Sequence, residues 1–74
     1  MGEKLPVITA GQLRRALLRA GWTEVRQRGS HVRVERGKVS ITIAEHGAHP
    51  IGRGLLATIL KAAGMSRDEL RRLL

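Results

Sequence analysis

An alternating pattern in the middle of the chain constrains its fold more than any other feature. Apolar and charged residues alternate over 22–28 and 31–36, and a third run over 39–43 repeats the same period of two. This alternation is typical of strands that bury one face. The connections at 29–30 and 36–38 each contain a glycine and are short enough to be tight hairpin turns. The pattern therefore predicts a three-stranded antiparallel meander.

The predicted meander has two different faces, because successive side chains of a strand point to opposite sides. One face carries the aliphatic side chains of the three runs: Val25, Val32, Val34, Val39, Ile41 and Ile43. The other face carries charged side chains: Glu24, Arg26, Arg28, Arg33 and Glu35. His31 shares the period of the charged set, so we expect its imidazole on the solvent side of the sheet or at its edge.

Helical spacing of apolar residues predicts a helix on either side of the meander. The first covers residues 10–20, with Thr9 and Gln12 as a capping box at its start and Gly21 as the cap at its end. The second covers residues 53–64, with the final glycine as its cap.

A second capping box, Ser66 to Glu69, predicts a short terminal helix. Three leucines of this helix are expected to fold back onto the core: Leu70, Leu73 and Leu74. Trp22, the single aromatic residue, directly follows the first helix. We expect it in the core rather than at a surface that stacks bases.

These elements combine into an α+β fold of the order α-β-β-β-α with a short C-terminal helix. Each main helix has one apolar stripe and the sheet has one apolar face, so packing the helices on one face of the three-stranded antiparallel sheet buries all three. This architecture is like that of a double-stranded-RNA-binding domain. With only 74 residues available, we expect residues 1–74 to form a single domain.

The chain is strongly basic, with 14 Lys and Arg against 6 Asp and Glu and a net charge of +8. This favours a polyanionic partner, either nucleic acid or an acidic protein surface, although an arginine-rich solvated surface gives the same composition. The chain has no cysteine, and His31, His46 and His49 with few carboxylates make a poor zinc set, so we expect no metal site. With no apolar run near the ~20 residues that span a bilayer and no secretory signal, we expect a cytoplasmic protein without a membrane partner.

His31 is the candidate for proton-transfer chemistry. Histidine has an ordinary pKa of about 6.5, which allows it to take and give a proton near neutral pH. Arginines that could hold the charge of a phosphodiester lie near it in the sequence and in the expected sheet: Arg26, Arg28 and Arg33. A surface histidine without a chemical role is the alternative interpretation.

Several segments together form a recognisable pattern. They are Leu5-Pro6-Val7-Ile8, Leu13 to Gly21 followed by Trp22, Arg26-Gln27-Arg28-Gly29-Ser30-His31, His46-Gly47, Gly54, and Ile59-Leu60 through Ala63-Gly64-Met65-Ser66. With this pattern the chain resembles the HicA family of toxins, the mRNA interferases of type II toxin–antitoxin modules. The likeness covers nearly the whole chain, and the triplet Gly29-Ser30-His31 in this order is its fairly specific part.

The resemblance implies a metal-independent endoribonuclease that cleaves mRNA, needs no cofactor and is neutralised by a HicB-like antitoxin protein. It implies that His31 is the catalytic histidine, that Gly29 forms the turn presenting it, and that Ser30 is a close neighbour. His46 falls where many members have a histidine and is the candidate second proton carrier. The residues expected to bind RNA are basic: Arg26, Arg28, Arg33 and Lys38.

The chain departs from the family's pattern near the second helix. Ala44-Glu45 precede His46 where a Pro-Val pair is more usual, Gly52 stands where a lysine is common, and Leu55 where a threonine is common. A basic contact and a hydroxyl at the helix start are therefore missing. RNA affinity, target choice or activity could differ accordingly.

Two other functions fit the same residues. A non-catalytic double-stranded-RNA-binding module would use this fold and charge to read A-form shape through phosphates and 2′-hydroxyls. An inactive HicA-like domain would use its basic face mainly to dock an acidic protein. RNA cleavage separates the enzyme from both, because only the enzyme changes the RNA covalently.

Overall fold

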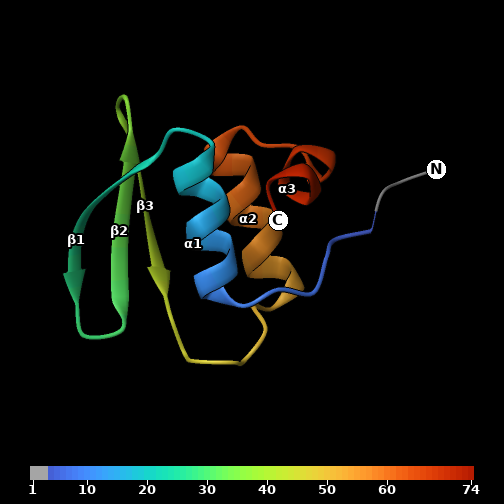
Figure 1. Cartoon of the computed structure of the whole chain (residues 1–74), viewed down its shortest axis with the longest axis horizontal. Coiled ribbons are helices and arrows are strands. Elements are labelled where there is room, and N and C mark those ends of the chain that lie inside the picture. The colour runs from blue at the N-terminus through green and yellow to red at the C-terminus, as the bar shows by residue number, and fades with distance from the viewer. Residues whose placement is uncertain (1–3) are drawn as a thin grey trace.

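The computed structural model of the chain describes residues 4–74. Its elements follow in the order α1 (Ala10–Arg19), β1 (Thr23–Arg28), β2 (His31–Arg36), β3 (Val39–Ala44), α2 (Arg53–Ala63) and α3 (Arg67–Leu73). All three helices lie on one side of the sheet, which stands at the left of the view in Figure 1. The predicted α-β-β-β-α order with a short C-terminal helix is confirmed.

The sheet is an antiparallel meander with strand order β1-β2-β3. Two-residue turns join its strands, and the first residue of each turn is a glycine in the left-handed region: Gly29 with φ 59° and Gly37 with φ 60°. A glycine at the first turn position suits the type II′ turn, whose twist matches that of the flanking strands. The first turn leads directly into His31, which pairs with Arg28 of β1.

The core lies between the helices and the inner face of the sheet. Leu13 and Leu17 of α1 and Leu70 of α3 are fully buried there. The sheet contributes four branched side chains to the same cluster: Val32, Val34, Ile41 and Ile43. The helix α2 adds three more: Leu56, Ile59 and Leu60. Because the aliphatic side chains of the sheet pack against the helices, the residues that alternate with them fall on the opposite face of the sheet.

The predicted caps define the helix ends. Thr9 with Gln12, and Ser66 with Glu69, form reciprocal capping boxes at the starts of α1 and α3. Gly64 ends α2 in a left-handed conformation. One expectation about α3 is wrong: Leu74 is 46% exposed, because it lies past the last residue of the helix.

Trp22 lies in the core, as expected, with only 4% of its surface exposed. The chain turns into this position after α1, where the N–H of Gly21 donates to the carbonyl of Leu18 and the N–H of Trp22 donates to that of Leu17. These two bonds form a Schellman motif, which satisfies carbonyls at the helix end. The buried indole Nε1 has no hydrogen-bond partner among residues 4–74.

β1 departs from the simple alternation. Glu24 pairs with Val34 and Arg26 pairs with Arg33, so Val25 is an extra residue in a β-bulge. The expectation that Val25 lies on the buried face is therefore wrong, and the residue is 47% exposed. The expectation for Glu24 is also wrong. Its pairing with Val34 places it on the helix side, where it forms an ion pair with Arg14 of α1 at 3.3 Å.

Candidate functional site

His31 is the first residue of β2 and lies on the outer face of the sheet, away from the helices. Its neighbours across the sheet are Arg28 of β1 and Ala44 of β3. The next residue, Val32, is completely buried, so the alternation of the strand fixes the direction of the imidazole. The prediction that His31 lies on the solvent side is confirmed.

Four of the predicted site residues line one hollow on this outer face. The hollow has a volume of about 160 Å³, and its lining comes from all three strands: Arg26, Arg28, His31, Arg33 and Thr42. The first turn pairs Arg28 with His31 and Arg26 with Arg33, so these four side chains fall on the same face. Three guanidinium groups and one imidazole thus surround a space open to solvent, an arrangement suited to a phosphate group.

Arg33 is held in place by two neighbours on the same face. Its Nε donates to Ser40 Oγ at 2.8 Å, and the Ser40 hydroxyl donates to Glu35 Oε2 at 2.8 Å. The same Nε lies 3.2 Å from Glu35 Oε2. These contacts engage Nε and orient the rest of the guanidinium. Arg33 is also one of the residues that line the hollow.

The turn that presents His31 is attached to the end of β3 and through it to α1. The carbonyl of Ser30 accepts a hydrogen bond from the backbone N–H of Glu45 at 2.7 Å. The carboxylate of Glu45 accepts from Arg14 Nε at 2.7 Å. On the other side of the turn, Gln27 Nε2 donates to the carbonyl of Gly29 at 3.3 Å. Glu45 is therefore neutralised by Arg14 and anchors the turn.

Lys38 does not belong to this hollow. It lies in the second turn, at the opposite end of β2 from His31. Five residue steps separate the two ends of the strand, which corresponds to about 17 Å at the usual rise. A nucleic acid would have to extend along the sheet to contact both ends.

His46 lies in a second hollow, of about 150 Å³, between the end of β3 and the start of α2. Its lining is mostly apolar: Ala10, Ala44, His46, His49, Pro50, Ile51, Gly52 and Leu55. None of these residues lines the hollow of His31. The structure therefore does not bring the two histidines into one hollow, although Ala44, which pairs with His31, contributes to the lining around His46.

The start of α2 has no side-chain cap. Gly52 is the N-cap of α2 and provides no side-chain hydrogen bond, unlike the caps of the other two helices. Leu55 is 57% exposed beside the second hollow. An apolar side chain thus stands exposed on the surface in the first turn of α2.

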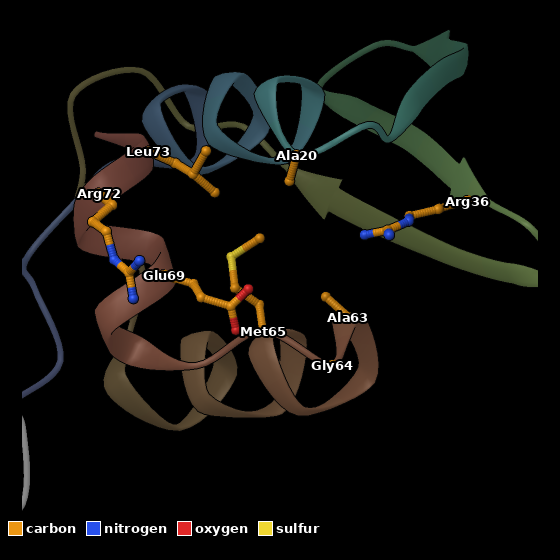
Figure 2. A pocket seen from close by; sticks show the side chains of 8 residues that line it. All are labelled: Ala20, Arg36, Ala63, Gly64, Met65, Glu69, Arg72 and Leu73. Atoms are coloured by element: carbon orange, nitrogen blue, oxygen red, sulfur yellow. The ribbon is translucent and has the colours of Figure 1, made fainter.

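Another hollow, of about 370 Å³, lies away from the outer face, among the C-terminal ends of α1 and α2 and the helix α3. Figure 2 shows Met65 at its centre and Arg36 reaching in from the end of β2. Glu69 accepts a hydrogen bond from the Ser66 N–H, and Arg72 forms an ion pair with Asp68. Two of its charged side chains therefore already have partners in α3 or at its N-cap.

Two searches of residues 4–74 bear on the broad class of protein. No three His, Cys, Asp or Glu side chains come together there as a metal-binding group. No helix in this part of the chain combines the length and the apolar character needed to cross a bilayer.

Comparison with known families identifies the chain. The model of a family described as HicA toxin of bacterial toxin-antitoxin matches residues 10–65, from the start of α1 to the residue after the cap of α2. The chain belongs to the HicA toxin family. Searches of curated proteins and of solved structures each found no match. The match to the HicA family covers all three strands and therefore the whole hollow around His31.

Sequence reasoning missed Thr42 and the Arg14–Glu45 pair. Thr42 could have been found, because the register of β3 places it on the same face as Arg33. The ion pair joins residues that are 31 positions apart, and no local pattern signals it.

Proposed function

We propose that this HicA toxin is a metal-independent endoribonuclease that cleaves mRNA with His31 as its catalytic histidine. One observation carries the proposal: His31 shares a solvent-accessible hollow with Arg26, Arg28 and Arg33. Proton transfer and charge neutralisation at a phosphodiester need these two kinds of group within reach of the same phosphate.

In the proposed reaction, the 2′-hydroxyl oxygen of one nucleotide attacks the adjacent phosphorus. A P–O bond forms at the 2′ oxygen, the bond to the 5′ oxygen of the next nucleotide breaks, and a 2′,3′-cyclic phosphate remains. His31 accepts the 2′-hydroxyl proton as general base, or supplies a proton to the 5′ oxygen as general acid. A positioned proton carrier of this kind typically contributes about 10²–10⁴-fold in rate.

The three arginines stabilise the negative charge that develops on the phosphoryl oxygens. Arg33 is the best oriented of them, because Ser40 and Glu35 hold its Nε. Arg26 and Arg28 approach from β1 on the other side of His31. Lys38 would contact the RNA backbone further along the sheet.

His46 is the proposed second proton carrier. It follows Ala44, the β3 neighbour of His31, by two positions, so a shift of its loop could bring it toward the same phosphate. Because His46 lies in a separate hollow, its proposed role requires this movement of the loop.

The proposed partner is a HicB-like antitoxin, which would cover the outer sheet face and present carboxylates to its arginines. Membership of a toxin–antitoxin family supports this pairing. The net charge of +8 favours an acidic surface on the partner. We further propose that residues 1–74 act as a single domain in the cytoplasm, where mRNA is available.

The test is cleavage of a mixed single-stranded RNA by purified protein in the presence of a chelator, with the product ends mapped. Wild type should give 2′,3′-cyclic phosphate ends, and His31→Ala should be slower by about 10²–10⁴-fold. His46→Ala should be slower too, whereas His49→Ala, a loop histidine with no proposed role, is the matched control. Equal cleavage by wild type and His31→Ala would overturn the proposal. If the wild type and all the variants bind the RNA but do not cleave it, the non-catalytic module would be favoured.

A further inference from the structure

A hydroxyl group completes the lining of the His31 hollow. Thr42 lies on β3 directly opposite Arg33, with its side chain exposed on the outer face. Within residues 4–74, no hydrogen bond engages its hydroxyl. By contrast, Ser40, the hydroxyl residue two positions earlier on the same face, is fully engaged by Arg33 and Glu35. The Thr42 hydroxyl is thus available to a ligand in the hollow.

The register of the sheet places this hydroxyl at a useful separation from the imidazole. His31 pairs with Ala44, so Thr42 is its diagonal neighbour on the same face. Diagonal neighbours in an antiparallel pair lie roughly 7–8 Å apart at the backbone. A phosphate that accepts a hydrogen bond from one residue and exchanges a proton with the other would fill this separation.

We propose that the Thr42 hydroxyl donates a hydrogen bond to one non-bridging oxygen of the scissile phosphate. This inference rests on the proposed function and adds a substrate-contacting residue to it. The arginines supply charge from several directions, but a single hydroxyl supplies one directed donor. As a β-branched residue in a strand, Thr42 has a restricted χ1, so little ordering is needed when the phosphate binds.

A directed donor selects between the two non-bridging oxygens, and this selection provides the test. The substrate is a short RNA in which wild type cleaves one mapped bond, made with sulfur in place of either oxygen at that phosphate. Sulfur accepts hydrogen bonds more weakly than oxygen. Wild type should therefore cleave one diastereomer more slowly than the other.

The variants are Thr42→Val, which removes the hydroxyl at nearly constant volume, and Thr42→Ser, which keeps it. On the all-oxygen RNA, Thr42→Val should lower kcat/KM by roughly 10- to 100-fold, at or below the lower end of what oxyanion donors contribute, because the hollow is open to water. Thr42→Ser should retain most of the activity. Thr23→Val is the matched control, since Thr23 lies on the same face, opposite Glu35 and outside the hollow.

The decisive readout is the ratio of rates for the two sulfur diastereomers. It should fall toward one in Thr42→Val and stay at the wild-type value in Thr23→Val, with melting temperatures unchanged in both. An unchanged ratio in Thr42→Val would overturn the role of Thr42 while leaving RNA cleavage by His31 intact. A wild type that cleaves none of these RNAs would overturn the proposed function itself.

Discussion

The two faces of the sheet differ sharply although they are made from the same three strands. On β2, Val32 and Val34 have no exposed surface, whereas His31 and Arg33, one position away from them, are exposed. The inner face holds branched aliphatic side chains against the helices. The outer face holds the imidazole, the guanidinium groups and the free hydroxyl. The comparison indicates that the inner face determines stability, whereas the outer face carries the proposed site, with little overlap between the two.

A core substitution should give the largest effect and should act on folding alone. Ile43, on β3 beside Thr42, is only 2% exposed. Replacing it by alanine should lower the free energy of unfolding by about 2–5 kcal/mol. A core this small rarely supplies more than about 3–5 kcal/mol of stability, so Ile43→Ala should leave much of the protein unfolded.

The milder Ile43→Val keeps this test informative. It should cost about 0.5–1.5 kcal/mol in urea unfolding, with cleavage per folded molecule equal to wild type. A selective loss of kcat in well-folded Ile43→Val would break the comparison, because it would show that inner-face packing tunes the hollow directly.

An outer-face substitution should give an intermediate effect, on RNA and not on folding. Arg28→Gln should weaken RNA binding several-fold and lower the slope of log K against log salt by about 0.7, the value for one phosphate contact on a single strand. Its free energy of unfolding should stay within about 0.5 kcal/mol of wild type. Arg36→Gln changes the charge equally but lies at the far hollow, so it is the control. If the salt slope were the same in both variants, RNA binding would depend on the overall positive charge of the protein and not on a contact at this hollow.

The smallest effect is expected at Glu24, the acidic residue that lies on the helix side. Its side chain is 34% exposed, and its ion pair with Arg14 is part of the surface at the sheet edge. Glu24→Gln should lower stability by less than about 1 kcal/mol and leave RNA binding unchanged. Glu35→Gln provides the contrast, since Glu35 holds Arg33 on the outer face. A clear gain in RNA affinity in Glu24→Gln would instead place its charge in the field of the phosphate.

Most of the fold could be predicted because its signals are local. Two glycine turns, two capping boxes and the alternation of β2 and β3 each lie within a few residues, and the structure has them where the sequence indicates. The bulge could not be predicted, because Val25 looks like one more apolar position of an alternating run. Which residue of β1 is left unpaired depends on how β1 pairs with β2 and on the contact of Glu24 with α1.

The candidate site was predictable in part for the same reason. His31, Arg26, Arg28 and Arg33 belong to one hairpin, so their spacing in sequence already brings them together. The neighbourhood of His46 depends on how the loop after β3 packs near α2, which is a tertiary question. The anchoring of the turn by Glu45 depends on a bond to Ser30 across the sheet, and on α1.

The bulge in β1 has a consequence for how sequences of this family can vary. Because Val25 has no pairing partner, the residues on either side of it fall on opposite faces, which separates a carboxylate from the arginines. If β1 kept its length and paired with β2 without the bulge, Glu24 would fall on the same face as Arg26 and His31. Deleting Val25 would not have this effect, because Glu24 would still pair with Val34 and Arg26 with Arg33. The extra residue can therefore be substituted or lost while the carboxylate stays on the helix side, whereas a one-residue shift among the paired residues of β1 would turn its arginines toward the helices.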